Sequence, residues 1–127
     1  MRKIVVDMQN CLFADSVAIA FNNSDYDIEV VRAESPNDTV ELCQVYNPFV
    51  LVMEVTGYAP WLLRERLRLR NEVKAVRPDC KIALIVDSNT EKQAVKDILE
   101  AKKNGIIDQF FYGSMTVEYL MDQIYSM

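Results

Sequence analysis

The sequence predicts a three-layer α/β sandwich, in which five parallel strands form one sheet and helices cover both of its faces. Two observations lead to this prediction. Five short apolar runs, rich in β-branched residues, alternate along the chain with segments whose apolar residues repeat at helical spacing. Three of these runs are continuously apolar, which is typical of parallel strands that are covered on both faces.

The predicted strands comprise residues 4–6, 28–31, 49–53, 82–86 and 106–111. The second run alternates apolar and polar residues, which is typical of an edge strand. Because connections between parallel strands are right-handed, five successive strand–helix units predict a doubly wound sheet with the flavodoxin-like strand order 2-1-3-4-5. This order puts the first, third and fourth strands side by side in the centre of the sheet.

The segments between the runs carry signals for the ends of helices. Ser35-Pro36 predicts the start of the second helix, with serine as N-cap and proline at the first helical position. Pro60 predicts the start of the third helix, and Pro78 lies just past its end. Residues 88–91 form a capping box before the fourth helix, and Gly105 is typical of the residue that closes it.

The first and last helices are indicated by apolar spacing alone. A helical face is formed by residues at that spacing in each segment, namely Phe13, Val17 and Ala20 in the first and Val117, Leu120, Met121 and Ile124 in the last. The five helices and five strands account for the whole chain, so we expect residues 1–127 to be a single domain.

Composition excludes several classes of function. The 127 residues include 14 basic residues, 19 acidic residues and no histidine, which gives a net charge of −5. The acidic balance argues against direct nucleic-acid binding, and the lack of histidine excludes serine–histidine hydrolases and histidine-bearing zinc sites. The three cysteines have no metal-binding or disulfide spacing, which favours a reducing cytoplasm. No apolar run is long enough for a signal peptide or a membrane span.

Carboxylates follow the three central strands. Asp7, Glu54 and Asp87 each end one of the predicted central strands. Because the carboxyl ends of parallel strands meet at one edge, we expect these residues to form an acidic edge. A magnesium-like cation or nearby helix N-termini would compensate the repulsion among the carboxylates. The alternative is that they are solvated loop residues.

This order and spacing resemble a response-regulator receiver domain (CheY-like) over essentially the whole chain. The resemblance implies that Asp7 is the first of the family's two metal-binding acids and that Met8 replaces the second. It places Glu54 at the position of the phosphoacceptor aspartate and Asp87 at the position of the family's serine or threonine. Counting without gaps from Gly105 puts Tyr112 at the position of the family's lysine. A shift of one residue would put Gly113 there instead, so neither register restores the lysine.

These departures predict a degenerate receiver, or pseudo-receiver. Glu54 is one methylene longer than aspartate, which moves its oxygens out of line for phosphoryl transfer. Tyr112 supplies no positive charge, and Asp87 adds a negative one. We therefore expect Asp7 and Glu54 to hold magnesium weakly or not at all, and no other cofactor is expected. An alternative is that Glu54 mimics a phosphorylated aspartate.

The resemblance implies a role in bacterial two-component, phosphorelay-type signalling, including transcription regulation. The expected function is a signalling module that acts through protein–protein contacts, with a signalling protein or its own output domain as partner. If the partner is its own output domain, the chain would be the front part of a longer regulator. One alternative is a magnesium-dependent phosphohydrolase or transferase that uses the strand-end carboxylates, although the chain has only three glycines and no phosphate-cradling loop. Another is a small-ligand sensor.

Two surface features complete the predictions. The third helix carries six basic residues, which we interpret as a solvated face, with a binding patch for an acidic partner or phosphate as the alternative; they are Arg64, Arg66, Arg68, Arg70, Lys74 and Arg77. The face formed by the fourth helix, fifth strand and fifth helix is the expected docking or homodimer surface, with Lys92, Lys96, Lys103, Tyr119 and Tyr125 as its contacts. The tyrosines could instead lie flat on a monomer surface.

Overall fold

The computed structural model describes residues 1–86 and 92–127 and contains one parallel five-stranded sheet in the order β2-β1-β3-β4-β5. This confirms the predicted strand order. The strands are β1 (Arg2–Asp7), β2 (Ile28–Arg32), β3 (Val50–Val55), β4 (Lys81–Val86) and β5 (Gln109–Tyr112). The described helices are α1 (Cys11–Asn22), the 3-10 turn η1 (Pro36–Asp38), α2 (Thr39–Tyr46), α3 (Leu63–Val76), α4 (Lys92–Lys103) and α5 (Val117–Tyr125).

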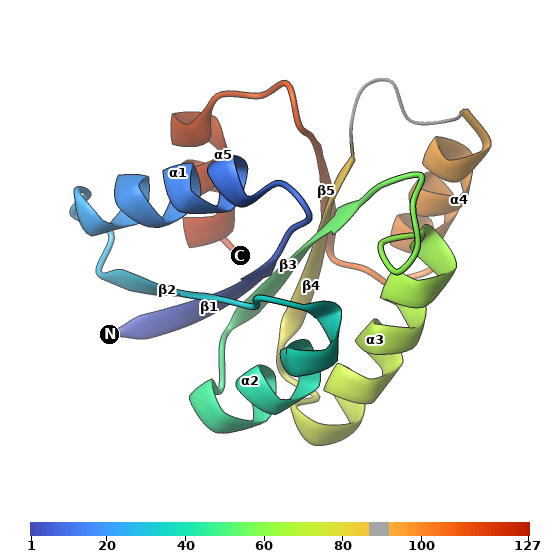
Figure 1. Cartoon of the computed structure of the whole chain (residues 1–127), viewed down its shortest axis with the longest axis horizontal. Helices are drawn as coiled ribbons and strands as arrows, with labels where there is room; N and C mark the ends of the chain where they lie inside the picture. The colour runs from blue at the N-terminus through green and yellow to red at the C-terminus, as the bar shows by residue number, and fades with distance from the viewer. Residues whose placement is uncertain (87–91) are drawn as a thin grey trace.

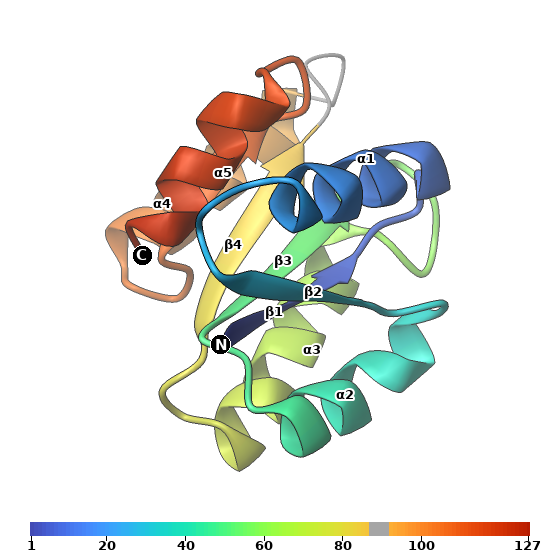
Figure 2. The same cartoon turned by 90° about the vertical axis from the view of Figure 1, so that its left-hand side faces the viewer.

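Helices cover both faces of the sheet, so the architecture is the predicted three-layer sandwich. Figure 1 shows α1 and α5 on one face and α2, α3 and α4 on the other, and Figure 2 shows the same layers after a quarter turn. The central strand β3 lies between β1 and β4, with Ile4 opposite Val50 and Val50 opposite Lys81. The carboxyl ends of these three strands therefore meet at one edge of the sheet.

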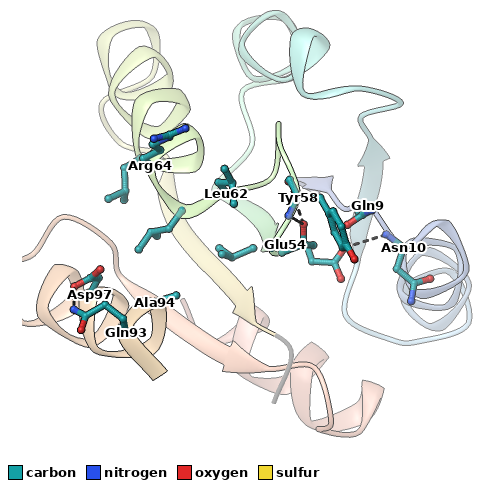
Figure 3. A pocket seen from close by; sticks show the side chains of 14 residues that line it. Gln9, Asn10, Glu54, Tyr58, Leu62, Arg64, Gln93, Ala94 and Asp97 are labelled. Carbon is teal, nitrogen blue, oxygen red and sulfur yellow. Dashed lines mark hydrogen bonds between the residues drawn. The ribbon is translucent and has the colours of Figure 1, made fainter. Parts of the chain in front are cut away.

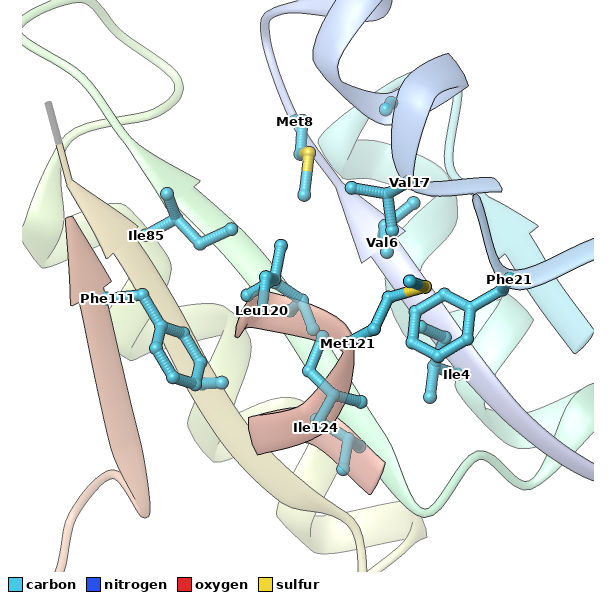
Figure 4. Packing of buried hydrophobic residues seen from close by; sticks show 14 of the residues in the cluster. Ile4, Val6, Met8, Val17, Phe21, Ile85, Phe111, Leu120, Met121 and Ile124 are labelled. Carbon is cyan, nitrogen blue, oxygen red and sulfur yellow. The ribbon is translucent and has the colours of Figure 1, made fainter. Parts of the chain in front are cut away.

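The sheet separates two buried clusters because successive side chains of a strand point to opposite faces. On the α1 and α5 side, Ile4 and Val6 of β1 pack with Val17, Phe21 and other buried residues (Figure 4). On the other side, Val5 packs in the cluster that includes residues of α2, α3 and α4. Asp7 lies two residues after Val5 in β1, so its side chain points to the same face of the sheet, toward α2 and α3.

Several predicted boundaries differ from those observed. Ser35 does act as an N-cap, but its hydroxyl accepts from Asn37 N–H and caps the short 3-10 turn, so α2 begins only at Thr39. The α3 helix begins at Leu63, because Pro60 lies in a turn that Trp61 N–H closes on Tyr58 O at 2.8 Å. Strand β5 begins at Gln109, after the predicted start of the run.

Other boundary predictions are confirmed. The α3 helix ends at Val76, just before Pro78, and Gly105 follows α4 with a left-handed φ of 74°. A residue with a side chain rarely adopts this conformation, which explains the glycine. The capping box predicted at residues 88–91 lies outside the described residues.

Candidate functional site

The candidate site lies at the carboxyl ends of the central strands, where the sequence predicts an acidic edge. Asp7 ends β1, and Glu54 lies near the end of the neighbouring strand β3, where Met53 is opposite Asp7. Asp87 lies outside the described residues. The structure thus brings the backbones of Asp7 and Glu54 to one edge, as expected.

The carboxylate of Asp7 is buried in an ion pair with Arg66 of α3. Arg66 Nη1 lies 2.7 Å from Asp7 Oδ2, and Arg66 Nη2 lies 3.1 Å from Asp7 Oδ1. The hydroxyl of Thr39, from the first turn of α2, donates to Asp7 Oδ2 at 2.6 Å. Asp7 is 1% exposed, and Arg66 and Thr39 are fully buried. Three charge-assisted or short hydrogen bonds therefore occupy both oxygens of this carboxylate.

The guanidinium of Arg66 also binds the backbone of both strand ends. Its Nε donates to Glu54 O at 2.7 Å, and its Nη2 donates to Asp7 O at 3.0 Å. A buried charge is tolerated only when it is paired and its donors are satisfied, and the planar fork of arginine meets this demand here. Arg66 consequently joins β1, β3 and α3 beneath the acidic edge.

The burial of Arg66 overturns its predicted place on a solvated face of the third helix. Arg64 and Arg68 of α3 are exposed, but Arg66 and Val73 are the buried residues of the helix. The spacing contains a signal that could have revealed this, because Arg66, Leu69 and Val73 follow the i, i+3, i+7 pattern of a buried stripe. Thr39 is the second residue of the candidate site that the sequence did not reveal.

Glu54 makes its contacts away from Asp7. Its Oε1 accepts from the backbone N–H of Asn10 at 2.9 Å, and Asn10 is the N-cap of α1. The positive end of the helix dipole favours a carboxylate at this place. Asp7 therefore turns toward α2 and α3, and Glu54 toward the start of α1, so these two carboxylates do not converge on a shared ligand. This corrects the expectation of a converging acidic edge for this pair.

Met8 and Tyr112 are the other two residues that the resemblance places in the site, and both are uncharged. Met8 is 8% exposed and packs in the core cluster on the α1 and α5 side, as expected for a packing residue (Figure 4). Tyr112, at the position of the family's lysine, is 42% exposed and packs edge-on against Phe110, with 5.7 Å between ring centroids. The described part of the site therefore draws its buried positive charge from Arg66.

A groove of about 1100 Å³ runs from the acidic edge between α3 and α4 (Figure 3). Asn10 lies at one end and Asp97 of α4 at the other, with Glu54 between them. Leu63 and Leu67 of α3 also line the groove. Tyr58, which is 72% exposed, forms part of the wall. Its lining is mixed, with apolar side chains, both signs of charge and several amides, so the charges do not select one class of ligand.

The side chains proposed for a docking surface have different surroundings. Lys92, Lys96 and Lys103 are exposed on α4, and Tyr119 of α5 is 52% exposed. Tyr125 packs on Tyr26, with ring centroids 4.7 Å apart, and the guanidinium of Arg2 lies 4.9 Å from its ring centroid. Tyr125 therefore lies on its own domain, as the alternative interpretation expected for the tyrosines.

Two properties concern the described residues as a whole. Within residues 1–86 and 92–127, no three side chains among His, Cys, Asp and Glu are grouped so that they could hold a metal ion. Within the same ranges, none of the helices combines the length and the apolar character needed to cross a membrane.

Comparison with known proteins connects this fold to receiver domains. The structure is similar to a response regulator from Thermotoga maritima, with a TM-score of 0.78 and 13% identity over 99% of this chain and 96% of that one. It is also similar to the chemotaxis protein CheY4 of Vibrio cholerae, with a TM-score of 0.75 and 14% identity over 99% and 98% of the two chains.

A CheY-like receiver domain protein from Methanospirillum hungatei has a TM-score of 0.74 and 12% identity over 99% of this chain and 92% of that one. No protein-family model matches the sequence, and no curated protein matches it. The structural neighbours are thus response-regulator receiver domains, and the chain has their CheY-like fold.

Proposed function

We propose that this chain is a receiver-like signalling domain that has lost standard aspartyl phosphorylation and acts through protein–protein contacts. The observation that carries the proposal is the buried ion pair between Asp7 and Arg66. Its shortest contact joins Arg66 Nη1 and Asp7 Oδ2 at 2.7 Å, which is typical of a strong charge-assisted hydrogen bond. The CheY-like fold of the structural neighbours supports the signalling role.

The ion pair argues against a magnesium ion at Asp7. Magnesium requires oxygen ligands with free lone pairs in near-octahedral geometry. Both Asp7 oxygens already accept hydrogen bonds, and the adjacent guanidinium would repel a second cation. Met8 contributes no oxygen ligand at the neighbouring position. The described residues therefore do not fit the metal that the resemblance implies.

The remaining departures act on the same reaction. Glu54 is too long for the in-line position of the family's aspartate, and its Oε1 is bonded to Asn10. Tyr112 supplies no charge at the position of the lysine. Loss of one preorganised group that stabilises the transition state costs on the order of 3 kcal/mol of barrier, so the combined losses make phosphorylation too slow for signalling.

Protein contacts are the proposed route for a signal. The α4, β5 and α5 face is the proposed docking surface, with the exposed Lys92, Lys96, Lys103 and Tyr119 as contacts. Tyr125 contributes less to it, because Tyr26 and Arg2 cover part of its ring. The proposed partner is a signalling protein or an output domain of the same protein in the cytoplasm.

The proposal is tested by incubating the protein with acetyl phosphate and magnesium and measuring its intact mass. We expect no phosphoryl gain in the wild type. The Glu54→Asp variant restores the shorter carboxylate but keeps Arg66, and we expect no gain there either. A stoichiometric gain of one phosphoryl group in the wild type, abolished by Glu54→Gln, would contradict the proposal.

A further inference from the structure

The outward face of α1 is apolar, although the helix lies in an outer layer of the sandwich, beside α5 (Figures 1 and 2). Its inward side buries Ala14, Val17 and Phe21 in the core. Successive residues of an α-helix are about 100° apart, so the positions that point directly away from this buried side are Leu12 and Ile19. They are 79% and 59% exposed. A surface helix usually carries polar or charged residues along this line.

The exposed side of α1 also lacks charge. The exposed residues of this helix are Cys11, Leu12, Ser16, Ile19 and Asn22. Charged residues make up 26% of the chain, but α1 contains only one of them. This residue, Asp15, forms an ion pair with Arg32 of β2. The centre of a protein–protein interface is depleted of charge in the same way.

Ser16 lies between the two exposed apolar residues, and its hydroxyl already has a partner. Its Oγ donates to Leu12 O at 2.9 Å, within the helix itself. Burying a polar group is costly when the group loses its hydrogen bond to water without a replacement. Ser16 would keep its hydrogen bond when covered, and its small side chain allows a second helix to approach closely.

We propose that a second copy of this chain packs on α1 and forms a weak two-fold dimer. The two α1 helices run antiparallel, and Leu12 of each copy contacts Ile19 of the other. This inference goes beyond the function proposed above, because it involves none of the residues of the α4, β5 and α5 docking surface.

The spacing of the two apolar side chains fits a two-fold axis. Leu12 and Ile19 are seven residues apart, which is about two helical turns and about 10 Å along the helix. Two antiparallel helices that cross beside Ser16 therefore place each Leu12 opposite Ile19 of the other copy. Such a contact uses the same patch on both copies and occurs twice in the dimer, and two-fold dimers are the commonest homo-oligomers.

The charge of the molecule favours a second copy at the same place. The net charge of −5 makes two copies repel each other over most of their surfaces, and the repulsion is least where a face carries no charge. The outward face of α1 has no charged group that would select a partner of either sign. Stable interfaces bury about 1,200–2,000 Å², which is large for one pair of short helices, so we expect a weak dimer.

The oligomeric state tests the proposal. Sedimentation velocity is measured in a reducing buffer over a series from micromolar to millimolar protein, and we expect the sedimentation coefficient of the wild type to rise along it. Leu12→Glu/Ile19→Glu should raise the dissociation constant at least about tenfold, because it places unpaired carboxylates in both contacts. Val45→Glu, which changes a 67% exposed valine on α2, is the matched control and should associate like the wild type.

Cross-linking tests the face without removing its apolar residues. A Cys11→Ser background eliminates the exposed native thiol, and the two remaining cysteines are buried. Adding Ser16→Cys places a thiol beside the proposed two-fold axis, where a short bismaleimide should join two copies. Ala75→Cys in the same background lies on the exposed side of α3 and should give no linked dimer.

A wild type that stays monomeric throughout the series would overturn the proposal. Association that Leu12→Glu/Ile19→Glu leaves unchanged would place the dimer on another face and would overturn it as well. Cross-linking of Ser16→Cys no greater than that of Ala75→Cys would overturn the antiparallel arrangement.

Discussion

A charged side chain without exposure to solvent is stable only when its charge and its hydrogen-bond donors are matched. Arg66 meets this condition through Asp7 and the carbonyls of Asp7 and Glu54. Removing one partner of such a pair leaves an uncompensated buried charge, which costs far more than the pair itself contributes. Substitution of Arg66 is therefore the sharpest test of the buried ion pair at the candidate site.

We expect Arg66→Leu to lower the free energy of unfolding by about 3–5 kcal/mol, because it leaves the carboxylate of Asp7 unpaired in the core. Arg68→Leu on the same helix is the matched control, and since Arg68 is exposed it should change stability by less than about 0.5 kcal/mol. Urea unfolding measures both values.

The double variant Asp7→Leu/Arg66→Leu should be more stable than the sum of the two single changes implies, because no charge remains to be paired. Equal losses for Arg66→Leu and Arg68→Leu would show that the ion pair is unimportant for stability.

Tyr26 provides a pH test on the opposite side of the sheet. Its hydroxyl donates to Asp122 Oδ1 at 3.0 Å, and this hydrogen bond, together with the charge of Asp122, raises the pKa of Tyr26 above its ordinary value of 10.0. Because the folded pKa is the higher one, the stabilisation is fully present below pH 10.0 and is lost as the pH rises through the folded pKa.

The difference in phenolate absorbance between the wild type and Tyr26→Phe isolates this titration. We expect its midpoint above pH 10.0 and expect Asp122→Asn to lower it. A midpoint that does not move in Asp122→Asn would rule out this hydrogen bond as the cause.

At the scale of elements, the start of α1 links a helix cap to the candidate site. The side chain of Asn10 accepts from Phe13 N–H at 3.1 Å, and its backbone N–H donates to Glu54. The side chain of Asn10 thus accepts from one of the free N–H donors of the first helical turn, and the carboxylate of Glu54 accepts from the backbone N–H of Asn10 itself. The beginning of α1 and the end of β3 are thus stabilised together.

We expect Asn10→Ala to lower stability by about 1 kcal/mol, because the first turn of α1 loses its side-chain cap. Asn10→Asp keeps an acceptor and should remain close to the wild type in thermal unfolding. The interpretation fails if both variants lose the same stability.

The strand order could be predicted from the sequence, but the exact starts of two helices could not. Apolar runs and helical spacing were enough to predict the sheet order, because burial on both faces leaves a strong pattern. The starts of α2 and α3 were predicted too early, since Ser35-Pro36 and Pro60 are also compatible with turns. A capping signal defines the local backbone, but it does not distinguish a 3-10 turn from the first turn of an α-helix.

The candidate site was harder to predict than the fold. The positions of Asp7 and Glu54 followed from the strand ends, but the partner of Asp7 did not, because Arg66 is 59 residues away in the sequence. A basic residue among five others on one helix suggests solvent exposure, and only the stripe it shares with Val73 indicates burial.

For the whole molecule, the proposed docking surface is the face formed by α4, β5 and α5. Tyr119 and the lysines of α4 are exposed on the proposed face, whereas Tyr125 is engaged with Tyr26. Aromatic groups beside charges are typical of interfaces, because they combine apolar area with polar contacts. The face is therefore best tested through Tyr119.

We expect Tyr119→Glu to weaken self-association through this face, because a charge introduced into an interface must be desolvated without a partner. Tyr46→Glu, which changes a 39% exposed tyrosine on α2, is the matched control and should associate like the wild type. Sedimentation velocity over a concentration series measures both. Equal association of all three proteins would remove Tyr119 from the proposed surface.

Because Arg66 is part of the chain, its pairing with Asp7 does not depend on the concentration of any ion in solution. An ion from solution leaves its site when its concentration falls or when a chelator competes for it, whereas a guanidinium on α3 is covalently part of the molecule. Its effective concentration at the carboxylate is set by the geometry of the folded chain alone. The charge of Asp7 is therefore balanced in every folded copy, whatever the surrounding medium contains.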